Sequence, residues 1–120
     1  MQTNKENKIV DLSRAFALNI IEYCELLESK KKFNMANQLF RSGTSIGANV
    51  REAQNGESKA DFIHKMKVAA KEADETEYWL GLCNDSKNYP NTAELLNQIE
   101  SINQTSNFLI DISQTSIKSN

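Results

Sequence analysis

The chain has 120 residues, of which 39% are hydrophobic and 25% are charged, and it contains one proline and four glycines. This length suits one domain with a single core, and so few turn-forming residues argue against an all-β fold. The formal net charge of −2 and the pI near 5.4 provide no global attraction for nucleic acid or for an acidic membrane. The first residues lack the apolar core of a signal peptide, and no stretch approaches the ~18 apolar residues of a membrane span. We therefore expect a single cytoplasmic domain over residues 1–120 that does not enter a membrane.

Polar, turn-rich breaks divide the chain into four segments, and each segment has apolar residues at spacings of three and four. This periodicity is typical of amphipathic helices, which we expect at roughly residues 7–29, 34–55, 59–85 and 92–117. Ser58 and Asn91 each stand three residues before an acid, so both are predicted helix N-caps. Four such helices with short connections pack most simply as an antiparallel up-down-up-down four-helix bundle, so the predicted fold class is all-α.

The first helix carries a core stripe that includes a cysteine. The stripe consists of Ile9, Ser13, Phe16, Ile20, Cys24 and Leu27. The third helix has a similar stripe made of Phe62, Met66, Ala69, Ala73, Thr76, Leu80 and Cys83. Because Cys24 and Cys83 lie on these apolar faces, we interpret them as reduced core cysteines. A metal site or a catalytic thiol would need companions that the chain does not offer.

Three of the chain's four glycines lie in the second helix or directly after it. Residues 41–62, RSGTSIGANVREAQNGESKADF, hold three of the four glycines beside arginines, which could suggest a phosphate-binding loop. At ~100° per residue, however, this part of the chain sorts into two faces of a helix. One face has Leu39, Gly43, Ile46, Val50 and Ala53, and the other has Gln38, Arg41, Ser42, Ser45, Asn49 and Glu52. A P-loop needs GxxxxGK[ST] after a strand, and neither is present. We predict instead that Gly43 and Gly47 let a neighbouring helix approach closely, at a helix-propensity cost of ~1 kcal/mol each.

Four polar residues of the second helix line one side of it: Arg41, Ser45, Asn49 and Glu52, which we call the polar stripe. One interpretation is a solvated face. The other is a contact surface for another subunit or a ligand, where an arginine and a carboxylate can pair across the contact.

Aromatic residues of the third helix lie away from its core stripe. Tyr78, Trp79 and Leu82 make the apolar arc wider than one bundle needs. Such an arc indicates either a second packing partner or partial burial against Phe108 and Ile112 of the fourth helix. Tyr78 and Trp79 therefore join the polar stripe as the candidate subunit or partner interface.

Catalytic chemistry finds little support in the residues. A di-iron bundle needs two Glu-x-x-His motifs, but the chain has one histidine, His64, which points away from the core stripe. The third helix also carries an acidic cluster, made of Glu72, Asp74, Glu75 and Glu77. Its members point around the helix rather than together, and Lys67 and Lys71 are placed to pair with Glu75 on a solvated face. We expect a protein that is not an enzyme, with no catalytic residue, metal or cofactor.

Several motifs match a known family. They are Arg-Ser-x-x-Ser-Ile-x-x-Asn at residues 41–49, Glu52-Ala53, Ser58-Lys-x-Asp-Phe-Ile, and Glu72-Ala-x-Glu-Thr-Glu-Tyr-Trp-Leu. The chain resembles the four helix bundle protein family, also called 23S rRNA intervening-sequence proteins because some are encoded in insertions within bacterial 23S rRNA genes. The similarity is dense over residues 38–83 and looser over the first and fourth helices.

The resemblance implies a left-handed four-helix bundle that assembles into a homopentamer and has no known catalytic activity. Related proteins accompany diversity-generating retroelements, where a pentameric barrel binds the reverse transcriptase and is implicated in contacts to nucleic acid. Those relatives are strongly basic, whereas this chain is slightly acidic. The family's recurrent polar residues map onto the polar stripe, which favours a contact between subunits there.

Two functions follow as hypotheses. The first is a non-catalytic scaffold, a homo-oligomeric ring of five copies by resemblance, which presents a surface to a protein partner. The alternative is an RNA-binding or other nucleic-acid-binding module linked to 23S rRNA intervening sequences or a reverse transcriptase. Its phosphate contacts would be Lys30, Lys31, Lys32, Lys65, Lys67 and Lys71, repeated around the ring.

Overall fold

The structure, a computed structural model, describes residues 4–118. Four helices make up nearly all of this part of the chain: α1 (Asn4–Ser29), α2 (Phe33–Gln54), α3 (Lys59–Asp85) and α4 (Ala93–Lys118). Their ends lie close to those expected from the spacing of apolar residues, and residues 4–118 contain no strand. The prediction of an all-α fold is confirmed.

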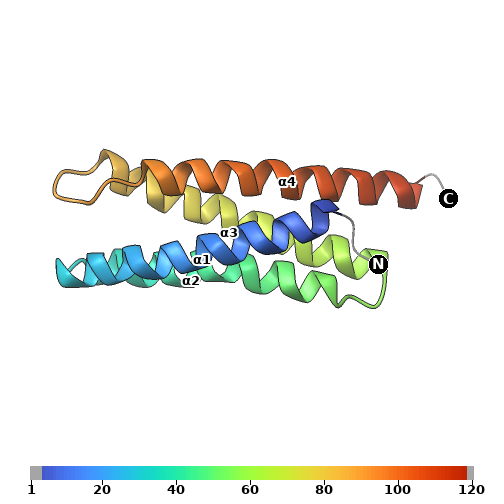
Figure 1. Cartoon of the computed structure of the whole chain (residues 1–120), viewed down its shortest axis with the longest axis horizontal. Coiled ribbons are helices and arrows are strands. Elements are labelled where there is room, and N and C mark those ends of the chain that lie inside the picture. The colour runs from blue at the N-terminus through green and yellow to red at the C-terminus, as the bar shows by residue number, and fades with distance from the viewer. Residues whose placement is uncertain (1–3, 119–120) are drawn as a thin grey trace.

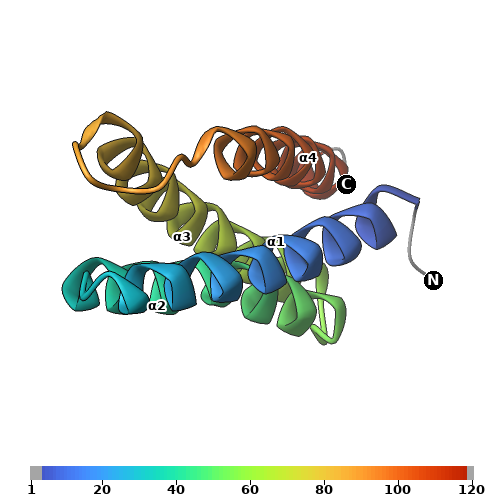
Figure 2. The ribbon, with the colours of Figure 1, turned by 60° about the vertical axis from the view of Figure 1, so that its left-hand side comes forward.

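The helices run alternately up and down along a body of 53 × 22 × 21 Å (Figure 1). Each helix lies beside its neighbours in the chain, and α1 also lies beside α4, which closes the bundle. Figure 2 shows α4 on the opposite side of the bundle from α2. The order around the bundle is therefore α1, α2, α3, α4, as short connections between antiparallel helices dictate. None of the helices, over the residues described, is long and apolar enough to span a membrane.

The core lies along the axis of the bundle and receives side chains from every helix. The largest fully buried side chains include Phe16, Ile20, Leu27, Leu39, Ile46, Met66, Leu80, Ile99, Ile102 and Leu109. Each contributes roughly 1.5–3 kcal/mol by leaving water. The predicted stripe of α3 needs one correction, because Ile63 is buried where Phe62 was expected. Ile63 stands three residues before Met66 on the same side of α3, and Phe62 packs against the core from its edge.

Close contact between α1 and α2 explains two glycines. A Cβ atom added at Gly43 would lie 2.9 Å from Cγ2 of Ile20, and one added at Gly47 would lie 3.4 Å from the carbonyl oxygen of Ser13. Both neighbours belong to α1. The predicted close approach of a neighbouring helix is thus confirmed, and these glycines belong to a packed helix rather than to a phosphate loop.

The turns between helices use local hydrogen bonds. After α1, the amide of Lys32 donates to the carbonyl of Leu27 at 2.8 Å and that of Lys31 to Glu28 at 2.9 Å. Lys31 has a φ of 63°, so the turn is a Schellman motif with a lysine where glycine is usual. Before α3, Ser58 Oγ accepts from the amide of Asp61 at 3.1 Å, which confirms this predicted N-cap.

The start of α4 differs slightly from the prediction. Asn91 Oδ1 accepts from the amide of Ala93 at 2.6 Å, but the residue that directly precedes the helix is Thr92. Thr92 is buried, and its hydroxyl donates to the carbonyl of Leu80 at 2.9 Å. This bond holds the loop against the end of α3. Because the Thr92 side chain is used in this way, the first amide of α4 is capped by Asn91, one residue before the usual N-cap position.

One residue of the expected polar face of α2 is buried. Ser42 is fully buried, and the hydroxyl of Thr76 on α3 donates to Ser42 Oγ at 2.9 Å. The prediction that Ser42 is on the outer face was wrong because α3 packs against that flank of α2. The two cysteines, by contrast, are buried free thiols as expected, and Cys24 Sγ donates to the carbonyl of Ala36 at 3.4 Å.

Candidate functional site

The polar stripe of α2 meets α3 in a network of charged and aromatic side chains. Arg41 forms an ion pair with Glu75, and its Nη1 lies 3.2 Å from Oε2 of Glu72. Glu75 Oε2 also accepts a hydrogen bond of 3.1 Å from the indole Nε1 of Trp79. We call these four residues the Arg41 network. The structure thus brings together Arg41 of α2 and Trp79 of α3, two residues of the candidate interface.

Hydrogen bonds within the network shift the acidity of its members. The indole of Trp79 and then the guanidinium of Arg41 hold the pKa of Glu75 below its ordinary value. The same contact with Glu75 raises the pKa of Arg41. Both residues are therefore charged at neutral pH, and Glu75 is already ordered against its partners.

The rest of the polar stripe bonds within the chain. Ser45 Oγ donates to the carbonyl of Arg41 at 2.5 Å, and Asn49 Nδ2 donates to the carbonyl of Ser45 at 2.9 Å. Glu52 accepts from Lys65 of α3 at 2.9 Å. The side chains of Arg41 and Glu52 are nevertheless 51% and 58% exposed. The stripe is one side of the α2–α3 seam, and its charged ends remain open to a partner.

The acidic cluster on α3 is more ordered than predicted. Glu72 and Glu75 were expected to point in different directions, yet both lie within reach of Arg41. The expected pairing of Glu75 with Lys67 or Lys71 was also wrong, because Glu75 faces α2 and is held by Arg41 and Trp79. The spacing of Glu72, Glu75 and Trp79 by three and four residues along one flank was the signal that could have shown this.

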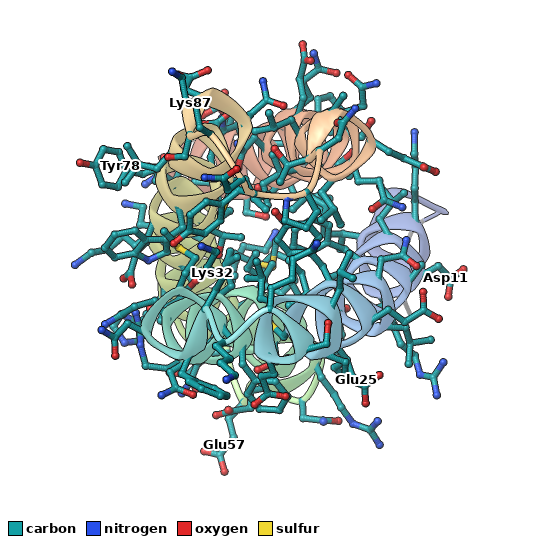
Figure 3. The ribbon with its side chains drawn as sticks, turned by 90° about the vertical axis from the view of Figure 1, so that its left-hand side faces the viewer. Asp11, Glu25, Lys32, Glu57, Tyr78 and Lys87 are labelled. Carbon is teal, nitrogen blue, oxygen red and sulfur yellow. The ribbon has the colours of Figure 1, made fainter. Side chains whose placement is uncertain are left out.

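The aromatic flank beside the network is open to solvent. Tyr78 is 62% exposed and points away from the bundle in Figure 3, and its ring centroid lies 5.3 Å from that of Trp79. Leu82, one turn further along α3, is 38% exposed. Trp79 itself is half-buried against the core.

Burial of this flank by α4 does not occur. Phe108 and Ile112 remain 46% and 43% exposed. The hydroxyl of Thr92 bonds to Leu80, so the start of α4 is level with the aromatic flank. Phe108 lies 16 residues beyond Thr92 and is therefore about 24 Å from that level along the bundle axis. The arc formed by Tyr78 and Leu82 is thus an exposed surface of this chain.

The six lysines of the RNA hypothesis do not form one patch. Lys30, Lys31 and Lys32 lie at the α1–α2 turn, where Lys32 Nζ is 4.9 Å from the ring centroid of Tyr89. Lys65 lies toward the opposite end of α3, about 30 Å from the C-terminal end of that helix, and is paired with Glu52. Lys67 and Lys71 are exposed between these ends.

Within the described residues, no group of three or more histidine, cysteine, aspartate or glutamate side chains could hold a metal ion. His64 is exposed, as predicted.

The fold places the chain in the class of antiparallel four-helix bundles. The family model described as 23S rRNA-intervening sequence protein matches residues 5–110, and the chain belongs to this family. A crystal structure from Bacteroides thetaiotaomicron VPI-5482 is similar, with 42% sequence identity and a TM-score of 0.80. The match covers 88% of this chain and 94% of that one, which is described as a protein with unknown function from the S23 ribosomal protein family. No curated protein matches the chain.

Acidification is expected to change the fluorescence of Trp79, the only tryptophan in the chain, with a midpoint below the ordinary glutamate value of 4.5. Protonation of Glu75 removes the negative charge of its carboxylate, which accepts the hydrogen bond of the indole N–H and pairs with Arg41. An Arg41→Gln variant should move this midpoint upward, because the carboxylate loses its cationic partner. Fluorescence titration of both proteins checks the result, and an unchanged midpoint in the variant would contradict the network.

Proposed function

We propose that the protein is a non-catalytic scaffold that assembles into a homo-oligomeric ring and presents a surface to a protein partner. The number of copies, five, is the one that the family resemblance implies. No catalytic family is indicated by the comparisons.

The observation that carries the proposal is the pairing of exposed apolar side chains on several faces of the bundle. Each pair lies on one side of its helix: Tyr78 with Leu82, Phe108 with Ile112, and Phe33 with Phe40. Single exposed apolar residues are normal on a monomer, whereas paired ones on separate faces favour contacts with more than one neighbour.

The α2–α3 seam suits the contact with a protein partner. It combines Tyr78, Trp79 and Arg41, and aromatic and arginine side chains are the types that dominate binding energy at protein interfaces. Because Glu72 and Glu75 already order Arg41, less side-chain freedom is lost when a partner binds.

The alternative, an RNA-binding module, draws less support from the arrangement of the chain. Its lysines lie toward different ends of the bundle and two of them are engaged by Tyr89 and Glu52. Repetition around a ring could still multiply a weak patch, so the experiment below includes a readout for bound RNA.

Size-exclusion chromatography with light scattering, run without nuclease treatment, tests the proposal. A ring of five should have five times the chain mass of 13.6 kDa and a protein-like absorbance spectrum. The mass of a single chain at every concentration tried would overturn the proposal. Excess absorbance at the nucleic-acid maximum would favour the RNA alternative, and steep weakening with salt would support it further.

A further inference from the structure

The aromatic flank of α3, made of Tyr78, Trp79 and Leu82, lies on the outer surface of the bundle. Tyr78 and Leu82 are both exposed and follow each other by one helical turn. Figure 3 shows Tyr78 projecting away from the four helices. Exposed apolar side chains that adjoin on one surface are typical of an interaction site.

A glycine without an internal role adjoins this flank. Gly81 follows Tyr78 by three residues and precedes Asp85 by four, so the three share the outer side of α3. A Cβ atom added at Gly81 would meet nothing within 4 Å, and the backbone there does not have a positive φ. The chain itself therefore does not require glycine at this position, although glycine weakens a helix relative to alanine. Close approach of a partner's backbone would require it, as the approach of α1 does at Gly43.

The C-terminal half of α3 is strongly acidic. Residues 72–86 contain no basic side chain and five acidic ones, which are Glu72, Asp74, Glu75, Glu77 and Asp85. Arg41 engages Glu72 and Glu75. The other three acids are exposed and form no ion pair with any residue that the structure describes. The nearest lysines along the chain, Lys71 and Lys87, lie outside this segment, so the flank is bordered by uncompensated negative charge.

The position of Asp85 opposes the helix dipole. Asp85 is the last residue of α3, and the last turn of this helix contains no basic residue. The C-terminus of a helix favours positive charge and disfavours negative charge. Asp85 and Gly81 thus both weaken α3, and neither is explained by a contact within the described chain. Residues that break local rules of stability in this way are typical of functional surfaces.

The exposed acids and the apolar side chains form one stripe along α3. We call it the outer stripe, and it consists of Asp74, Tyr78, Leu82 and Asp85. Their spacings of three and four residues keep them on one side of the helix. The distance from Asp74 to Asp85 along the helix is about 16 Å. A complementary partner therefore has an apolar centre and positive charge toward both ends, over about three helical turns.

From these observations we infer that the outer stripe of α3 binds a basic amphipathic helix of a protein partner. The partner helix lies along α3 and crosses it at Gly81, where the two backbones can approach closely. Its apolar side chains pack on Tyr78 and Leu82, and its lysine or arginine side chains pair with Asp74 and Asp85. The inference rests on the proposed presentation of a surface to a protein partner, and it assigns the chemistry of that partner.

A helix suits this surface better than an extended segment. Residues 4–118 contain no strand, so they offer no sheet edge with which the backbone of an extended partner could pair. A helix satisfies its own backbone groups and binds through its side chains. The hydrogen bond from Trp79 to Glu75 already fixes the indole beside Tyr78, so little side-chain freedom is lost on binding.

Trp79 is the only tryptophan of the chain and reports directly on this surface. The probe is a synthetic peptide of leucine and lysine, about 16 residues long, with its leucines at spacings of three and four. It should change the fluorescence of Trp79 saturably at about 0.15 M salt. Neither a peptide with glutamate in place of lysine nor one with serine in place of leucine should bind. No saturable change with the first peptide, or an equal change with the glutamate peptide, would overturn the inference.

Substitutions in the full-length protein locate the contact. Asp85→Lys and Leu82→Ser should each weaken binding of the peptide about tenfold. Gly81→Gln should also weaken it about tenfold, because the added side chain keeps the partner helix away. Asp85→Lys and Gly81→Gln should nevertheless raise the melting temperature, since lysine suits the helix C-terminus and glutamine is the better helix former. A purely structural role for these residues would not combine weaker binding with higher stability.

Glu57→Lys is the matched control. It makes the same change in net charge as Asp85→Lys, but it lies before the other end of α3, and Glu57 projects in a different direction from Tyr78 in Figure 3. This variant should keep the affinity of the parent for the peptide. Equal weakening by Glu57→Lys and Asp85→Lys would overturn the inference, because binding would then follow net charge alone.

Light scattering separates this inference from the proposed function. The variants of the outer stripe should keep the mass of the parent. If they change the mass, the stripe is a contact between copies of the chain, and the inference is overturned. A parent that is itself a single chain would overturn the scaffold proposal, whereas the peptide titration decides about the outer stripe in either state of assembly.

Discussion

Replacing Gly43 with alanine is expected to lower the free energy of unfolding by about 1–3 kcal/mol, although alanine is the better helix former. The added Cβ would lie 2.9 Å from Cγ2 and 3.0 Å from Cγ1 of Ile20, a side chain that is fully buried. Ile20 is β-branched and cannot swing away without leaving its rotamer, so α1 and α2 must separate. Urea denaturation of the variant and the parent measures the change.

Gly81 provides the matched control for this substitution. It also lies within a helix, α3, but an added Cβ there would meet nothing within 4 Å. Gly81→Ala should therefore raise the free energy of unfolding by about 0.5–1 kcal/mol. In an Ile20→Ala background, Gly43→Ala should lose most of its penalty, because the clashing atoms are gone. Equal effects at Gly43 and Gly81 would contradict a close contact between α1 and α2.

Alkaline pH is expected to destabilise the fold between about pH 9 and pH 11, which are the ordinary and the raised pKa of the Cys24 thiol. Burial raises this pKa first, and the nearby charges of Glu28 and Cys83 add to the effect. The folded state keeps the proton that the unfolded state loses, so stability is fully present below pH 9 and falls as the pH rises toward 11. The pKa of this thiol differs by about two units between the unfolded and folded states, and each unit corresponds to ~1.4 kcal/mol, so the free energy of unfolding should fall by roughly 2–3 kcal/mol.

Burial also raises the pKa of Cys83 and of Tyr23, whose hydroxyl donates to the carbonyl of Pro90 at 2.7 Å. These groups act in the same direction. The measurement is the urea midpoint at a series of pH values through this range. Cys24→Ala should show a smaller decline with pH than the parent, and a parent whose midpoint did not change would contradict the buried, neutral thiol.

Much of the fold could be predicted from local pattern. The spacing of apolar residues places all four helices, because one stripe per helix must turn inward whatever the partner is. Gly43 and Gly47 were recognisable as helix-packing residues for the same reason, since they lie on or beside the apolar face of α2. The Ser58 cap depends on residues only three apart, so no tertiary contact is needed to predict it.

The contacts at the α2–α3 seam could not be predicted from the sequence, because they depend on which helices lie side by side in the bundle. A helical wheel gives the direction of Arg41 but not the neighbour that occupies it, so its pairing with Glu72 and Glu75 required α3 to be placed beside α2. Ser42 was misassigned for the same reason, because α3 covers the flank on which it lies. The six lysines of the RNA hypothesis likewise could be located along the bundle only from the antiparallel arrangement of the helices.

The sequence by itself thus determined the number of helices, their approximate limits, the core stripes and the family motifs, all of which depend on short-range spacing. The tertiary structure decided which polar residues meet and which of them are buried. Those properties depend on the order of the helices around the bundle and on their relative positions along its axis. The periodicity within one helix contains no information about the order or the relative positions of the helices.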